Sequence, residues 1–394
     1  MEVNPRAEYV NNHIHTSYSF SPYTPAEAVR AAKAAGLLTA GIMDHDTIAG
    51  AVEFVREAKT AGIAATVGLE CRCSMDGTPF EGRRINNPDQ KSVAYLALHA
   101  VPRCSIDKVQ AFITPYRQAR NVRNRAMTER LDALFAPFGI GLDYTRDVEP
   151  ISMARMGGTV TERHILYALA LKLTAAFNAG PDLVRFLSGS FDVTAGGAVR
   201  EKLSTPGEPL YEYHLLGLLK SGFVDKFYID AGDELPHVTD FIRLARETGA
   251  IAAYAYLGDV GGSVTGDKKD AAYEDAYLDE LTAWLPEAGF HAVTYMPARN
   301  TLEQLTRIAA LCARYGLFQI SGEDINSPFQ SFVCEALADP RHAGLIDAAW
   351  AMIGHERIAA NDPELGMFSQ RTVANIPDLY ERIRKYAALG RENI

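Results

Sequence analysis

The chain has 394 residues, of which 47% are hydrophobic and 22% are charged, a composition typical of a globular protein with a large core. Its formal net charge of −10 argues against a nucleic-acid surface as the main function, because phosphate contacts need clustered Lys and Arg. No apolar run approaches the roughly twenty residues of a membrane span, and no basic and apolar leader precedes residue 9. Five cysteines, an odd number, favour a reduced cytoplasm over a disulfide framework.

Four apolar runs are each followed directly by histidine or acidic residues. The motifs are His13-Ile14-His15-Thr16, Asp44-His45-Asp46, Gly68-Leu69-Glu70 and Ser321-Gly322-Glu323-Asp324. Because side chains alternate faces along a strand, His13 and His15 point the same way, at a separation that suits two ligands of one transition metal. An H-x-H pair alone is at least as consistent with ordinary polar residues at a strand end. Four such motifs together indicate one site.

Helix signals lie between the first three apolar runs. Residues 24–35 begin with Thr24, carry Glu27 three positions later and stop at Gly36. Residues 47–61 begin with Thr47 and stop at Gly62 in the same way. Strands and helices in alternation predict βα units, and the C-terminal strand ends of a parallel α/β barrel converge on one face. The sequence therefore predicts that the polar motifs meet at one end of a barrel.

These motifs resemble those of the polymerase and histidinol phosphatase (PHP) domain superfamily of metal-dependent phosphoesterases. The family opens with H-x-H-T, continues with I-T-D-H-D-T and G-x-E, and closes with G-S-D-x-H. The corresponding segments here are residues 13–16, 42–47, 68–70 and 322–326. The resemblance spans residues 9–75 and 220–330, and it implies an α/β fold, a distorted seven-stranded (β/α) PHP barrel with a helical insertion domain.

The resemblance further implies ligands for up to three metals. The ligands of the first metal are all present, as His13, His15, Glu70 and Asp324. We therefore expect one divalent ion per chain, either zinc, manganese or iron, since this ligand set contains no thiolate to bias the choice.

The ligands of the other two metals are mostly missing. The second metal would share Glu70 and take two histidines, but Tyr95 and Tyr256 stand in those strands, and a neutral phenol is a poor ligand at neutral pH. The alternative is that the motif is locally misaligned and that His99, four residues after Tyr95, is the ligand. The positions of the third metal are Phe20, His45 and Asn326. We interpret this pattern as one intact mononuclear site beside two dismantled ones.

Residues 102–214 interrupt the barrel with helical patterns. In relatives, an insertion at this place forms a lid with an R-P-H-I-A segment, and residues 162–166 match it in part. The match implies substrate contacts for Arg163 and His164, because the arginine fork suits paired phosphate oxygens. A solvated arginine and a half-buried histidine at a helix start explain the same residues equally well. We assign the rest of the chain to the two parts of the barrel, residues 1–101 and 215–345, and to a C-terminal helical extension, residues 346–394.

Other candidate substrate contacts come from the barrel strands. Arg72 shares a strand face with Glu70, whereas Cys71 and Cys73 lie on the opposite face, which indicates buried thiols rather than metal ligands. The further candidates are Tyr95, Tyr256 and Asn326.

Two functions follow as hypotheses. The first is a hydrolase of a small phosphate ester, in which Asp44 or His45 accepts a proton or steers the water. The second is a protein that keeps one structural or ligand-binding metal and has lost phosphatase activity. We favour the hydrolase, because four converging polar ligands would otherwise lack a partner. We expect its substrate to be a small phosphorylated molecule and its location to be the cytoplasm. We expect neither nucleic acid nor a membrane as a partner.

Overall fold

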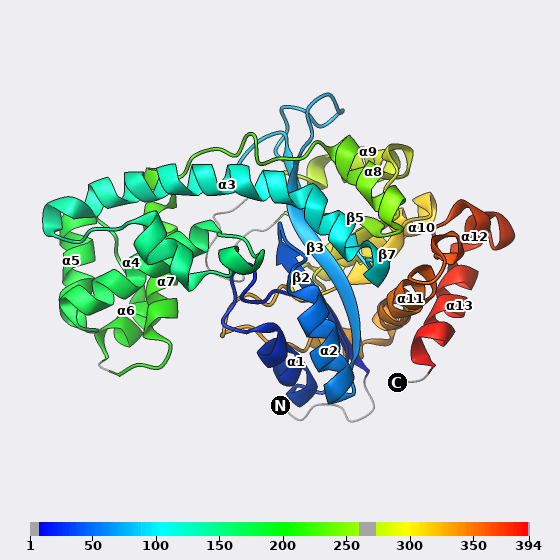
Figure 1. Cartoon of the computed structure of the whole chain (residues 1–394), viewed down its shortest axis with the longest axis horizontal. Coiled ribbons are helices and arrows are strands. Elements are labelled where there is room, and N and C mark those ends of the chain that lie inside the picture. The colour runs from blue at the N-terminus through cyan, green and yellow to red at the C-terminus, as the bar shows by residue number, and fades with distance from the viewer. Residues whose placement is uncertain (1–7, 88, 206, 260–272, 393–394) are drawn as a thin grey trace.

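The computed structural model describes residues 8–87, 89–205, 207–259 and 273–392, and its centre is a seven-stranded sheet (Figure 1). The strands lie side by side in chain order and curl into an open barrel, so the predicted distorted seven-stranded barrel is confirmed. They are β1 (Tyr9–Ile14), β2 (Leu37–His45), β3 (Ala64–Ser74), β4 (Val93–His99), β5 (Ile251–Tyr256), β6 (Ala292–Tyr295) and β7 (Phe318–Ser321).

The prediction that all barrel strands are parallel is wrong for β4. This strand pairs antiparallel with both β3 and β5, whereas the other neighbouring strands are parallel. The reason is the connection: the described residues between β3 and β4, 75–87 and 89–92, contain turns and no helix, which suits a chain that folds back beside β3. Glu70 then lies opposite Ala97, and Arg72 lies opposite Tyr95.

Asparagine side chains join the two ends of the sheet. Asn11 donates to the carbonyl of Glu323 at 3.1 Å and accepts from its N–H at 3.0 Å. Asn12 donates to the carbonyl of Ser321 at 2.8 Å. A parallel bridge between Ile14 and Ile325 extends this seam. The residues that follow β7 are therefore fixed beside β1, where the histidines lie.

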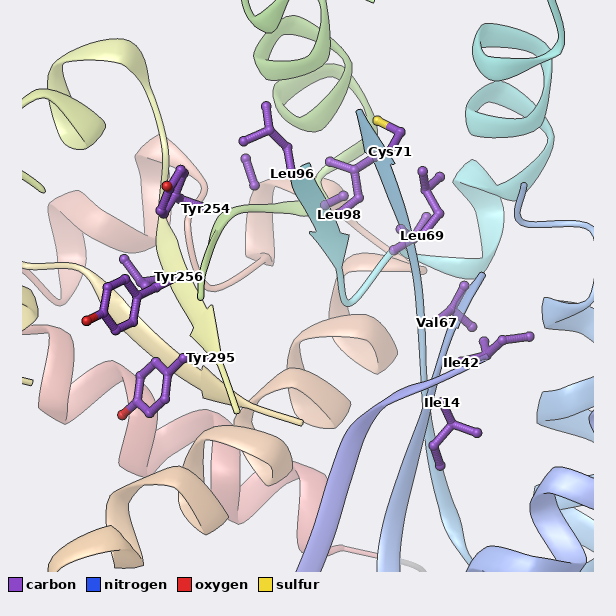
Figure 2. Close-up of a cluster of buried hydrophobic side chains, with 14 of the residues drawn as sticks. Ile14, Ile42, Val67, Leu69, Cys71, Leu96, Leu98, Tyr254, Tyr256 and Tyr295 are labelled. Carbon is purple, nitrogen blue, oxygen red and sulfur yellow. The ribbon is translucent and has the colours of Figure 1, made fainter. Parts of the chain in front are cut away.

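Helices cover the outer face of the sheet and bury a large apolar core (Figure 2). Thr24 caps α1 with the predicted capping box to Glu27. Thr47 is not a cap as predicted: Gly50 precedes α2, and the Thr47 hydroxyl donates to the carbonyl of Gly157 at 2.7 Å. The covering helices are α1 (Pro25–Ala34), α2 (Ala51–Ala61), α8 (Val238–Thr248), α9 (Leu278–Ala288) and α10 (Leu302–Tyr315).

The inner face is closed from one end by the C-terminal helices. Apolar residues of β2, β4 and β5 pack in one cluster with α11 (Ala343–Ala359), and α13 (Leu379–Arg391) lies against α11. Gly354 and Gly390 allow this contact, because a Cβ on either would meet a backbone oxygen of the other helix at 2.0 Å. A short helix, α12 (Gln370–Asn375), lies between them in the chain.

A helical lobe with its own apolar core stands beside the barrel (Figure 1). The long helix α3 (Ile106–Phe135) runs from the barrel into this lobe. It is followed there by α4 (Glu162–Phe177), α5 (Pro181–Phe191), α6 (Gly197–Ser204) and α7 (Tyr211–Phe227). The buried side chains of α7 belong to the lobe core up to Phe227, so the lobe extends past residue 214, where the sequence interpretation ended it.

A buried ionic network connects the lobe to the strand ends. Arg123 on α3 donates to Glu162 at 2.5 Å and to Glu234 at 2.5 Å, and Arg120 donates to Glu162 at 2.8 Å. Three arginines and three carboxylates share the network, and all are largely shielded from solvent. They are Arg72, Arg120, Arg123, Asp46, Glu162 and Glu234.

None of the helices in the described ranges combines the length and the apolar character needed to cross a membrane.

Candidate metal centre

Strand β1 delivers two imidazoles to the inner face of the barrel. The ring centroids of His13 and His15 are 5.0 Å apart, as the alternation of side chains requires. Within the described residues, Nε2 of each ring is fully buried and makes no hydrogen bond. A buried nitrogen without a partner costs free energy, so both atoms point to a missing ligand.

A third imidazole and a carboxylate come from the neighbouring strands. Glu70 Oε2 on β3 lies 3.5 Å from His13 Nε2 and 3.3 Å from Nδ1 of His45, which ends β2. The rings of His15 and His45 stack with their centroids 4.5 Å apart. Parallel pairing of His45 with Glu70 places both at the same height of the sheet.

The second carboxylate comes from the segment after β7. Asp324 Oδ1 lies 3.1 Å from Nε2 of His15. Gly322 makes this approach possible, because a Cβ there would lie 2.6 Å from Cβ and 2.8 Å from the backbone nitrogen of His13. The ligand atoms form two overlapping groups, each within 4.8 Å: His13, His15 and Asp324, and His15, His45 and Glu70.

The electrostatics favour the ligand forms of Glu70, Asp324 and His45. At His13 burial lowers the pKa, but Glu70 and the other nearby carboxylates outweigh burial and raise it. Burial raises the pKa of Glu70, but its contact with His13 and the nearby imidazoles outweigh burial and lower it to about 2. Burial likewise opposes ionisation of Asp324, yet the contact with His15 holds its pKa well below the usual range. Burial and the charge of His15 lower the pKa of His45 to about 3. Ionised carboxylates and a neutral imidazole are the forms that bind metal.

Asp44 is not a free base, contrary to the catalytic role predicted for it. Its carboxylate accepts hydrogen bonds of 2.6 Å from the backbone N–H of Thr16, the hydroxyl of Thr16 and the hydroxyl of Ser19. Burial raises its pKa, although the charge of His15 and these donors oppose the shift. Asp44 therefore holds the loop after β1 rather than facing solvent.

Arg163 and Asn326 form a chain that ends on Asp324. Arg163 Nη1 donates to Asn326 Oδ1 at 2.5 Å, and Asn326 Nδ2 donates to Asp324 Oδ1 at 2.6 Å. A guanidinium can only donate and a carboxylate here accepts, so the orientation of the amide is fixed. The first turn of α4 thus reaches a residue of the ligand cluster.

Two other predicted substrate contacts are occupied elsewhere. His164 Nδ1 accepts from the backbone N–H of Thr161 at 3.0 Å and closes the capping box of α4, with its ring 4.9 Å from that of Phe20. Arg72 pairs with Glu234 in the ionic network and donates to Tyr228 Oη at 3.1 Å. The Arg72 guanidinium and Nδ1 of His164 are thus engaged within the protein.

The tyrosines differ in position. Tyr95 lies beside the ligand cluster, with its ring centroid 6.1 Å from that of His45. Tyr256 points to the outer face with Tyr254 and Tyr295 (Figure 2), and its hydroxyl donates to Asp275 at 2.6 Å. Its assignment to the site is wrong, because on β5 the inward positions are those of Ala253 and Ala255.

His99 lies on the inner face of β4, fully buried, with Nε2 unpartnered among the described residues. Burial lowers its pKa to about 3. It is not a member of either convergent ligand group, so the alternative that His99 replaces Tyr95 as a ligand gains no support from those groups. Cys71 and Cys73 are buried on the opposite face, as the sequence predicted.

Sequence reasoning missed Ser19 and the partners of the arginines. Ser19 Oγ lies 3.3 Å from His15 Nδ1. A serine four residues after a histidine carries no pattern of its own. Glu234 is separated from Arg123 by 111 residues, so no local spacing marks that pair.

Comparisons with known proteins agree with this geometry. Residues 11–139 match the family model of the PHP domain. Comparison with curated proteins finds no match. A proposed metal-dependent phosphoesterase from Bifidobacterium adolescentis is 19% identical, with a TM-score of 0.54 over 85% of this chain and 96% of its own. An amidohydrolase from Chromobacterium violaceum, with bound sulfate and no metal, is 18% identical, with a TM-score of 0.52 over 83% of this chain and 90% of its own.

At these identities the two structures show a shared fold alone. The family-model match covers most of β1, all of β2 to β4 and all of α3, which include the first three motifs, and the seven-stranded barrel continues through residue 321. Residues 11–139 are therefore similar to the PHP domain, and the chain shares its barrel fold with the two structures.

Proposed function

We propose that this chain is a metal-dependent hydrolase of a small phosphate ester, with one divalent ion held by His13, His15, Glu70 and Asp324. The observation that carries the proposal is the pair of buried, unpartnered Nε2 atoms facing two carboxylates. Zinc, manganese or iron fits imidazole and carboxylate ligands. When bound, such an ion lowers the pKa of a water molecule and polarises a phosphoryl oxygen.

The geometry supports a single ion. The two ligand groups share His15, and Nδ1 of His15 is engaged with Ser19. Only Nε2 of His15 is left to bind a metal ion, and one nitrogen can ligate one ion. The two groups therefore cannot each hold a separate ion that uses His15 as a ligand. We include His45 in the same centre, because a group with a pKa of about 3 is a poor base at neutral pH but a good neutral ligand.

Arg163 is the arginine that we assign to the substrate. The arginines of the ionic network are already paired with carboxylates, and their charge is compensated. Arg163 contacts the amide and carbonyl of Asn326, and within the described residues it has no carboxylate partner. Tyr95, beside His45, would add a phenol to the substrate wall.

All five cysteines are free, which supports the expectation of a reduced, cytoplasmic setting.

The test is a panel of phosphomonoesters with the metal-loaded enzyme. We expect kcat/KM to fall by at least about a hundredfold in His15→Ala, because the metal is lost, and by less in Arg163→Ala, which loses charge stabilisation only. Arg155→Ala, an exposed arginine of the same lobe, should change little. If no ester is hydrolysed while a neutral metabolite raises the melting temperature, the chain is a binding protein instead.

A further inference from the structure

Ser19 lies between a buried carboxylate and the central histidine of the metal centre. It is fully buried in the loop after β1. Its Oγ lies 2.6 Å from Asp44 Oδ1 and 3.3 Å from His15 Nδ1. Asp44 and Ser19 thus form a line that ends on the ring nitrogen of His15 that faces away from the ligand cluster.

The direction of each hydrogen bond in this line is determined. Asp44 Oδ1 already accepts the backbone N–H of Thr16 at 2.6 Å, and the ionised carboxylate has no hydrogen to donate. Ser19 has one hydroxyl hydrogen, and it must go to Oδ1. Toward His15 the serine oxygen can only accept, and Nδ1 of His15 must therefore carry a hydrogen.

The tautomer of His15 follows from this assignment. A neutral imidazole with a hydrogen on Nδ1 has its lone pair on Nε2, and Nε2 is the buried atom 3.1 Å from Asp324. Without Ser19, the ring would gain a better hydrogen bond in the other tautomer, with Nε2–H donating to Asp324. In that form Nε2 carries a hydrogen and has no lone pair for a metal ion.

We propose that Ser19, oriented by Asp44, is a positioning residue that holds His15 in its metal-binding tautomer. This inference rests on the metal centre proposed above. Partners of this kind typically change metal affinity by about 10- to 100-fold. The same serine also fastens the loop to Asp44, so the experiment has to separate the tautomer from loop stability.

The experiment compares Ser19→Ala with Ser17→Ala. Ser17 is in the same loop, and its hydroxyl is buried without a hydrogen-bond partner among the described residues. The substitution Ser17→Ala therefore removes the same chemical group without changing a contact of His15. Zinc affinity is measured by chelator competition. We expect it to fall about 10- to 100-fold in Ser19→Ala and to stay within about twofold of the wild type in Ser17→Ala.

The second readout is the ¹⁵N spectrum of the imidazoles in the metal-free protein, at a pH where His15 is neutral. The wild type and Ser17→Ala should show hydrogen on Nδ1 of His15, and Ser19→Ala should shift it toward Nε2. Asp44→Asn keeps an oxygen that can accept from Ser19, so it should retain the wild-type tautomer. Loss of zinc affinity with an unchanged tautomer, or unchanged affinity in Ser19→Ala, would overturn the inference.

Failure of the metal centre itself gives a different result. In that case the wild-type protein shows no zinc affinity in the same competition, and the proposed function fails with it. A wild type that binds zinc, together with a Ser19→Ala variant that binds equally well, contradicts only the role of Ser19.

Discussion

Gly322 shows how a residue without functional groups shapes the metal centre. It lies against β1 so closely that an added Cβ would overlap the backbone nitrogen and Cβ of His13. Glycine is required here for close approach of two chain segments and not for an unusual backbone angle. The carboxylate of Asp324, two residues later, reaches His15 because of that approach.

We predict that Gly322→Ala both destabilises the fold and weakens metal binding. Overpacking of this kind costs about 1–3 kcal/mol, and the strain would displace His13. The free energy of unfolding of the metal-free protein and the zinc affinity are the measurements. Gly344→Ala is the matched control, because a Cβ at Gly344 meets open space. Wild-type zinc affinity in Gly322→Ala would show that the contact does not position the histidine.

The residues that the sequence could identify are those with local patterns. His13, His15, Glu70 and Asp324 stand in recognisable motifs at strand ends, and the structure brings them together. Tyr256 was misassigned because one position along a strand reverses the face, and the sequence alone did not fix the register of β5.

At the scale of elements, the sequence predicted helices better than strand direction. The capping pattern predicted the start of α1, and the glycines predicted where α1 and α2 stop. The reversal of β4 was missed, because strand direction depends on the connection before it, and the turn signal of Asp76 and Gly77 in that connection was not weighed. The same reversal explains why Tyr95, near the start of β4, lies opposite Arg72.

The end of β5 contains a titratable element away from the metal centre. Glu274 is buried, and its Oε1 accepts from the N–H groups of Leu257 at 2.8 Å and Gly258 at 2.6 Å. Its other oxygen accepts from the hydroxyl of Tyr254. Burial raises the pKa of Glu274 to about 7, although these donors oppose the shift.

This raised pKa predicts a pH-dependent stability. Below about pH 4.5 Glu274 is neutral in both states. Between its unfolded and folded pKa values only the unfolded chain is ionised, so the stability contributed by the neutral carboxyl is lost as pH rises through about 7. The loss amounts to at most about 3 kcal/mol.

The check is the melting temperature of the metal-free protein between pH 5 and pH 8. Glu274→Gln should melt higher than the wild type at pH 8, and their difference should shrink toward pH 5. Glu287→Gln, which changes an exposed carboxylate of α9, should follow the wild type throughout. A constant difference between Glu274→Gln and wild type would contradict the assignment.

At the scale of the whole molecule, the lobe and the barrel meet beside the metal centre. The first turn of α4 supplies Glu162 to the ionic network and Arg163 to Asn326. Burying charges is favourable only when each has partners of good geometry, as here. The sequence indicated a helical insertion but could not place it, because the pairs that dock it are separated by up to 162 residues. Its docking therefore had to come from the structure.

The central claim is one metal centre built by the strand ends of a PHP barrel, and elemental analysis of the purified chain tests it most directly. We predict one zinc, manganese or iron ion per chain after removal of loosely bound metal, and none in His15→Ala, because His15 belongs to both ligand groups. A metal-free wild type that takes up no ion, or a chain with two ions at full occupancy, would contradict the account.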